Sequence, residues 1–190
     1  MKHLLAAILV GATALTATAC GDSPTSPSSQ GSRFFLRLSA SAFQSAPAAL
    51  VTFTHVRATH ASGGSTDVAL PNGAAQFTCD LRKLQTSDGE IAAGTLPPGD
   101  YSEVRLTVQS ATLYLDNPTT VACAADFRVP SGRSTPVSGT PSEIVVNRTF
   151  RVEAGADTIM RIALNSEQSI RAGGGGSYTF QPLVTVLSVN

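Results

Sequence analysis

The chain of 190 residues contains no tryptophan, has only 14% charged residues and carries a formal net charge of zero. Because the few basic residues are scattered singly, the sequence offers no basic surface for nucleic acid or an anionic membrane face, and we expect neither as a partner. Without tryptophan, an aromatic platform for sugar rings has weak support. Core or edge packing is therefore the expected role of Tyr101, Tyr114 and Tyr178, with stacking on a sugar as the alternative.

Histidine is also scarce, since only His55 and His60 follow His3. Neither Ser65 nor Ser177 has the second glycine of a nucleophile elbow, and a serine nucleophile needs a positioned base. The two later histidines are five residues apart, which puts them on opposite faces of a regular strand unless a bulge realigns them. Carboxylates are dispersed, and no calcium, phosphate-loop or dinucleotide motif occurs. The sequence therefore predicts no catalytic residues, no metal site and no cofactor.

Long apolar runs are absent except at the start of the chain. Residues 1–3 are positively charged, and residues 4–15 form an apolar run of about 12 residues, too short to cross a bilayer as a helix. The small residues 17–19 then precede Cys20. This order is typical of a lipoprotein signal peptide over residues 1–19, with lipid attachment at Cys20. The same small residues also suit the ordinary signal peptidase, so simple secretion remains the alternative.

The three cysteines support lipidation, because acylating Cys20 leaves an even pair, Cys79 and Cys123. In an oxidising envelope, that pair can form a disulfide closing a loop of about 45 residues, which contributes about 4 kcal/mol in the chain-entropy model. The alternative is two separately buried thiols, since Cys79 lies between the apolar Phe77 and Leu81. We favour the disulfide.

The rest of the chain divides into a tether and a domain. Residues 20–32 comprise the lipidated cysteine and a Ser/Pro-rich segment without large apolar side chains, which we expect to stay flexible. Residues 33–190 suffice for one domain with a substantial core. Gly21, where an aspartate would favour the inner membrane, favours the outer membrane under the usual sorting pattern.

Short alternating runs separated by Gly, Pro, Asn and Ser predict an all-β fold, an antiparallel β-sandwich with at most one short helix, at residues 165–170. The clearest strand starts at Tyr101, and its alternation changes phase at Ser110, which requires a bulge or a new strand. A similar phase change separates Phe53 from Val56. Residues 173–176, four glycines, are expected to connect a hairpin.

Further strands are predicted at five places, and in each of them every second side chain is expected to point inward. They are residues 34–38, 77–81, 144–152, 158–164 and 178–189. The expected inward side chains are Phe34, Leu36, Leu38, Val104, Leu106, Val108, Ile144, Val146, Phe150, Val152, Met160, Ile162, Leu164, Phe180, Val184 and Val186.

Several segments resemble one known family. Residues 96–106, LPPGDYSEVRL, are similar to the L-P-x-G-x-Y-x-x-[VI]-R-L centre of the DUF4382 family, a domain of unknown function in bacterial and archaeal envelope proteins. Residues 80–84 resemble its D-L-x-x-L stretch, 129–132 its VPSG turn, 150–155 its F-x-V-x-A-G and 178–184 its terminal Y-x-L-K-P-V-I. The resemblance implies an antiparallel sandwich with transthyretin-like (prealbumin-like, Ig-like) topology, and it supplies no catalytic residues.

We therefore expect a lipid-anchored cell-envelope module, non-enzymatic, with a binding or structural role. Its expected partners are the membrane, through the lipid on Cys20, and a glycan or another envelope protein. A carbohydrate-binding or adhesion domain at the cell surface is the alternative. A hydrolase is the less favoured reading, because no cluster of acid, base and nucleophile is visible in the sequence.

Overall fold

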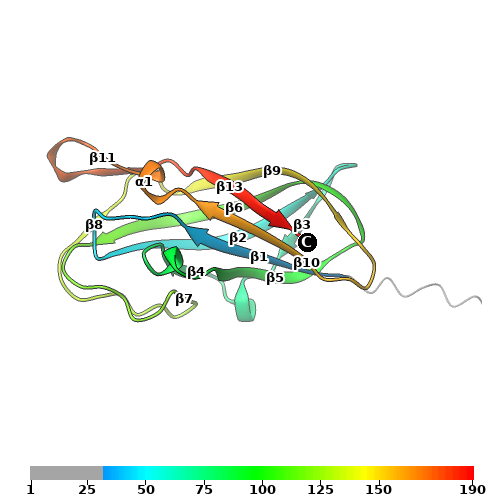
Figure 1. Cartoon of the computed structure of the whole chain (residues 1–190), viewed down its shortest axis with the longest axis horizontal. Coiled ribbons are helices and arrows are strands. Elements are labelled where there is room, and N and C mark those ends of the chain that lie inside the picture. The colour runs from blue at the N-terminus through cyan, green and yellow to red at the C-terminus, as the bar shows by residue number, and fades with distance from the viewer. Residues whose placement is uncertain (1–31) are drawn as a thin grey trace, which may run out of the picture.

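The computed structural model describes residues 32–190, and most of this segment forms two β-sheets packed on a common core (Figure 1). The smaller sheet has the strand order β13 (Val184–Val189), β10 (Thr158–Leu164), β1 (Ser32–Ala40), β5 (Gly89–Leu96). The larger sheet has the order β7 (Cys123–Ala124), β4 (Phe77–Asp80), β2 (Ala48–His60), β6 (Gly99–Tyr114), β8 (Ser134–Pro136). Beside this path, β3 (Ser65–Val68) pairs with β2 and β9 (Ser142–Val152) pairs with β6. The predicted all-β sandwich is confirmed.

The remaining elements are short. A hairpin of β11 (Ile170–Ala172) and β12 (Tyr178–Phe180) encloses the four glycines, as expected. The single helical turn predicted at residues 165–170 is also confirmed, as α1 (Ser166–Ser169). Asn165 caps this turn, because its side chain accepts a hydrogen bond from the backbone N–H of Gln168. Three 3-10 turns complete the described chain: Pro71–Gly73, Lys83–Gln85 and Gly174–Gly176.

The alternation of apolar and polar residues places the core as predicted. Every predicted inward residue of β1, β6, β9 and β10 is buried, and all of them belong to one cluster shared by the two sheets. Burying a large aliphatic or aromatic side chain stabilises the folded state by about 1.5–3 kcal/mol, so this cluster dominates the folding energy. Val184 and Val186, on β13, are only partly buried against it.

The two predicted phase changes are β-bulges within continuous strands. Thr52 pairs with Ser110, but Phe53 already pairs with Val108, so Gln109 is an extra residue in β6. One step further, Thr54 is extra in β2. Each bulge restores the inward phase of the following side chains, which keeps both halves of these long strands on one core.

Four details of the sequence prediction need correction. Ser32 was assigned to the tether, yet it is buried in β1, where its hydroxyl donates to the Glu153 carbonyl and accepts from the Gly155 N–H. The strand expected over 178–189 is split around Pro182, which has no N–H to donate to a ladder. The sheets are not wholly antiparallel, because β1 and β10 run parallel. The chain passes from the larger sheet to the smaller one between β9 and β10, so β10 joins β1 without a hairpin between them. Finally, β3, β5, β7 and β8 were not predicted.

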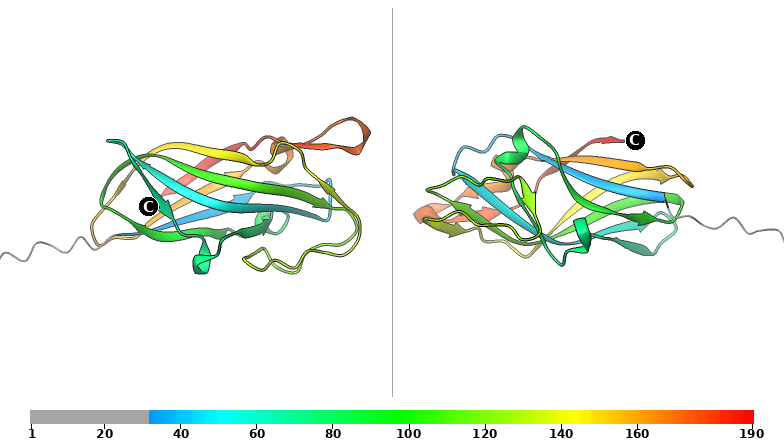
Figure 2. Two further views of the ribbon diagram at one scale, coloured as in Figure 1. Left: turned by 180° about the vertical axis from the view of Figure 1, so that it is seen from behind. Right: turned by 90° about the horizontal axis from the view of Figure 1, so that it is seen from below.

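The loops gather at two opposite ends of the sandwich. β1 begins at Ser32 at the end that holds the β2–β3, β5–β6 and β9–β10 turns, which we call the proximal end (Figure 1). The other end, the distal end, carries the β1–β2 loop, the β11–β12 hairpin and the long loop 115–133 between β6 and β8. Figure 2 shows the same separation from behind and from below. Within residues 32–190, no helix has the length and apolarity required to span a membrane.

Candidate functional site

The structure tests the predicted cysteine residues in part. Cys20 lies outside the described residues, whereas Cys79 and Cys123 form a disulfide, as favoured above. The bond joins paired positions of β4 and β7, with Cα atoms 4.1 Å apart. Because Cys123 belongs to the 115–133 loop, the disulfide fixes the middle of this distal loop to the edge of the larger sheet.

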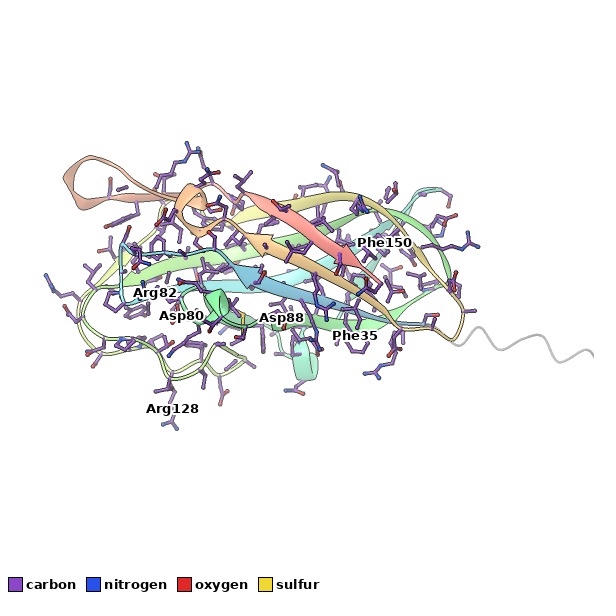
Figure 3. All side chains as sticks on the ribbon, viewed as in Figure 1. Phe35, Asp80, Arg82, Asp88, Arg128 and Phe150 are labelled. Atoms are coloured by element: carbon purple, nitrogen blue, oxygen red, sulfur yellow. A yellow bond between two sulfur atoms is a disulfide. The ribbon has the colours of Figure 1, made fainter. Side chains whose placement is uncertain are left out.

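A fully buried carboxylate holds the same loop at a second point. Asp80 Oδ1 accepts hydrogen bonds from the backbone N–H groups of Ala49 and Arg82, each at 3.0 Å, and Oδ2 accepts one from the Thr119 hydroxyl. The Asp80 N–H donates to the Ala122 carbonyl at 2.7 Å. A buried carboxylate is tolerated only when its oxygens are satisfied in this way. Figure 3 labels Asp80 and Arg82 side by side toward the distal end.

The two ends of the 115–133 loop are clamped to each other. The Arg133 guanidinium donates to Asp116 Oδ1 at 2.9 and 3.1 Å, and its backbone N–H donates to Oδ2 at 2.6 Å. The side-chain hydrogen bonds lower the pKa of Asp116 and raise that of Arg133. Asn117 adds a bond to the Ser131 carbonyl at 2.9 Å. Gly132, at φ +104°, has no room for a Cβ, which would lie 2.6 Å from Asp116 Oδ2.

Between this loop and the outer face of the larger sheet lies a groove of about 320 Å³, which we call the loop groove. A row of hydroxyl side chains crosses its floor, since Thr52 pairs in register with Thr78 on one side and with Ser110 on the other. The Thr52 and Thr78 hydroxyl oxygens are 2.9 Å apart. Thr112, two residues after Ser110 on the same face of β6, adds a fourth hydroxyl. Strands β4, β2 and β6 thus present four hydroxyl side chains to the loop, with the apolar Leu50 beside them on β2.

The walls of the loop groove are aromatic and apolar. Tyr114 contributes from the end of β6, while Phe127 and Val129 contribute from the loop. Gln76 and Gln109 also line it, and none of the lining residues identified in the described chain is charged. Tyr114 is the one predicted sugar-stacking tyrosine at this site. The sequence prediction missed the groove as a whole, because its parts come from three strands and a loop.

Tyr101 has the expected packing role. Its buried ring stacks on Phe150 at a centroid distance of 5.2 Å, Phe150 stacks on Phe34 at 5.6 Å, and the His60 ring meets Tyr101 edge-on at 5.1 Å. The Tyr101 hydroxyl donates to the Pro97 carbonyl, four residues back, at 2.8 Å, which is the arrangement of the tyrosine corner of β-sandwich domains. Burial raises the pKa of Tyr101. The LPPGDY segment therefore organises the proximal end of the fold.

The two histidines are not brought together. His55 is exposed on the outer face of the larger sheet, in a second surface site beside Arg57, Arg105 and Glu143. His60 instead packs on the buried Tyr101 side chain (described above), and its Nδ1 lies 2.7 Å from a serine hydroxyl of the following turn. Within residues 32–190, no group of three or more His, Cys, Asp or Glu side chains is placed to hold a metal ion.

The family comparison covers nearly the whole sandwich. The model of DUF4382, described as a domain of unknown function, matches residues 32–182, from the first residue of β1 to the segment before β13. No curated protein and no solved structure matches the chain, so the transthyretin-like topology stays a prediction. Because the match spans well over half of the 190 residues, the chain belongs to the DUF4382 family.

Proposed function

We propose that this protein is a lipid-anchored module of the cell envelope that binds a partner at its distal end without catalysing a reaction. The observation that carries the proposal is Cys20, which directly follows a segment typical of a lipoprotein signal peptide. The Cys79–Cys123 disulfide supports the same compartment, because disulfides persist in oxidising environments outside the cytoplasm. It also leaves Cys20 as the one cysteine available for acylation.

The layout of the sandwich supports a display role. Ser32, where the tether would join the domain, is fixed at the proximal end by the β9–β10 turn. The 115–133 loop, which forms one wall of the loop groove, lies at the distal end (Figure 1), so an anchor on Cys20 would hold this loop at the end of the domain farther from the membrane. A coil of a dozen residues would space the domain about 20 Å from the lipid, and two or more acyl chains make such anchoring stable.

Binding, rather than catalysis, is supported by the chemistry of two surface sites of the described chain, the loop groove and the site around His55. The loop groove is lined by neutral hydroxyl, amide and apolar side chains, without a histidine or carboxylate to act as acid or base. The site around His55 contains two ion-paired arginines, since Arg105 contacts both Glu103 and Glu143 and Arg57 contacts an aspartate of β3. A paired, exposed charge cluster is typical of a solvated surface.

Metabolic labelling with an alkyne fatty acid, followed by mass spectrometry of the mature N-terminus, tests the anchor. The wild-type protein should carry the label on Cys20, partition into Triton X-114 and fractionate with the outer membrane. Cys20→Ala should lose the label and the partitioning. The double variant Cys79→Ser/Cys123→Ser is the matched control for thiols, and it should keep both.

A wild-type protein that starts at an unmodified residue 20 and appears in the medium would contradict the anchor. That result would favour the secreted alternative instead. Fractionation with the inner membrane would contradict only the expected sorting by Gly21. Neither outcome depends on what the loop groove binds.

A further inference from the structure

We infer that the loop groove binds a neutral saccharide, as the end or a short stretch of a glycan chain. The inference rests on the proposed binding role but not on the lipid anchor. It goes beyond the family assignment, which names no ligand.

The floor of the groove has the hydrogen-bonding character of a sugar site. Thr52, Thr78, Ser110 and Thr112 present hydroxyls from three adjacent strands, and each hydroxyl can both donate and accept. Sugar hydroxyls have the same dual character, so a saccharide can satisfy such a row in many orientations. The amides of the two lining glutamines extend this capacity at the rim, as amides offer both donors and an acceptor.

The walls suit the apolar faces of a pyranose ring. Tyr114 and Phe127 line the same groove, from β6 and from the loop, and both side chains are partly exposed. An aromatic ring in that position covers C–H groups of a sugar while the floor hydroxyls bind its edge. Val129, at 61% exposure one of the most exposed large apolar residues of the described chain, continues the apolar wall. An exposed apolar side chain beside a polar floor is the mixed surface that sugars require.

Other ligand classes fit the groove less well. A phosphate or carboxylate ligand would find no counter-charge among the lining residues of the described chain. A lipid tail would cover the Ser110 and Thr112 hydroxyls without replacing their hydrogen bonds to water, which costs about 1–3 kcal/mol for each group, whereas Thr52 and Thr78 bond to each other. An extended peptide is bound most readily by a free sheet edge, whereas this groove lies on a face whose strands are already paired with one another.

The loop wall is held in place before any ligand arrives. The disulfide, the Asp80–Thr119 hydrogen bond and the Asp116–Arg133 clamp anchor the loop at its middle, its first half and its ends. A ligand therefore pays little entropy for ordering the loop. Reduction of the disulfide should accordingly weaken binding.

Isothermal titration calorimetry of the intact chain in mild detergent tests the inference, with neutral oligosaccharides of glucose, xylose, mannose and N-acetylglucosamine as the probes. At least one series should bind. Phe127→Ala should lower the affinity about tenfold, from the loss of one aromatic contact, and Ser110→Ala about fivefold, from the loss of one hydrogen bond. The Phe127 side chain is partly exposed and Ser110 is exposed, so the variants should fold.

Two matched variants control for position. Val121→Ala changes the same loop, and Thr107→Ala the same strand, yet neither residue lines the groove. Both should bind like the wild type. No binding of any neutral glycan at millimolar concentration would overturn the inference, while leaving the anchor untouched. Binding that survives Phe127→Ala and Ser110→Ala would overturn the groove as the site, and binding of neutral peptides but not sugars would overturn the ligand class.

Discussion

Replacing Asp80 with alanine should destabilise the sandwich and free the 115–133 loop. The variant leaves the Ala49 and Arg82 N–H groups without their acceptor, and an unsatisfied buried donor costs about 1–3 kcal/mol. Ala49 is fully buried, whereas Arg82 is partly exposed and can be hydrated, so its cost is at the low end. The Thr119 hydroxyl can turn to the Val121 carbonyl, 3.1 Å away, and adds little. We expect a loss of about 3 kcal/mol in the free energy of unfolding.

Urea unfolding of three variants separates this effect from a loss of charge. Asp80→Asn keeps one oxygen for the two N–H groups, and its amide can donate to the Thr119 hydroxyl, so it should lose only about 1 kcal/mol. Asp67→Ala, which removes a carboxylate exposed on β3, should unfold like the wild type. Limited trypsin digestion follows the loop directly, since Arg128 is exposed at its outer edge (Figure 3). Cleavage there should be faster in Asp80→Ala.

An Asp80→Ala protein with the wild-type urea midpoint and wild-type cleavage at Arg128 would refute this reasoning. Equal losses in the alanine and asparagine variants would instead show that the negative charge, and not the hydrogen-bond count, is what the site requires.

Three further predictions concern the loop clamp, the disulfide and the proximal turn. The Cys79→Ser/Cys123→Ser double variant should lose about 4 kcal/mol in urea unfolding, and a reductant should have no effect on it; an equal effect of reductant on both proteins would contradict this. The pKa of Asp116 is lowered from 3.8, so its clamp should stabilise the fold fully above that pH and lose this effect as the pH falls further. The urea midpoints of the wild type and Asp116→Asn should therefore converge in acid. A constant gap would speak against the clamp. Gly99→Ala should lower the free energy of unfolding by about 2 kcal/mol in thermal or urea unfolding, because φ is +154° there and the His60 ring lies where the new Cβ would be. Gly174→Ala, whose Cβ would meet no other atom, should be neutral.

The sequence predicts the fold best where one face of a strand is buried and the other face is exposed to solvent. In β6, β9 and β10 the alternation identifies both the strand and its inward side chains. β5 escaped prediction because its sequence, GEIAAGTL, consists mostly of small residues and buries Ile91 and Ala92 side by side, without alternation. β3 escaped because its four residues are mostly polar.

The candidate site was less predictable than the fold. Counting cysteines favoured the disulfide over two buried thiols, because the expected lipidation of Cys20 leaves a pair. The role of Asp80 required tertiary information, since its partner Thr119 is 39 residues away and belongs to a loop without regular structure. The floor of the loop groove is built from Thr and Ser residues, which occur throughout the chain, and only the pairing of β4, β2 and β6 gathers these particular ones into a row.

The clamp between Asp116 and Arg133 has a consequence for how this domain can diversify. Both ends of the loop leave the sheet at one point and the disulfide fixes its middle, so residues 125–130, between the disulfide and the clamp, can lengthen or shorten without moving β6 or β8. The entropy of closing such a segment grows only slowly with its length, about 0.6 kcal/mol for each doubling. Changes of length and sequence in these residues would therefore alter the surface beside the larger sheet while the rest of the sandwich stays the same.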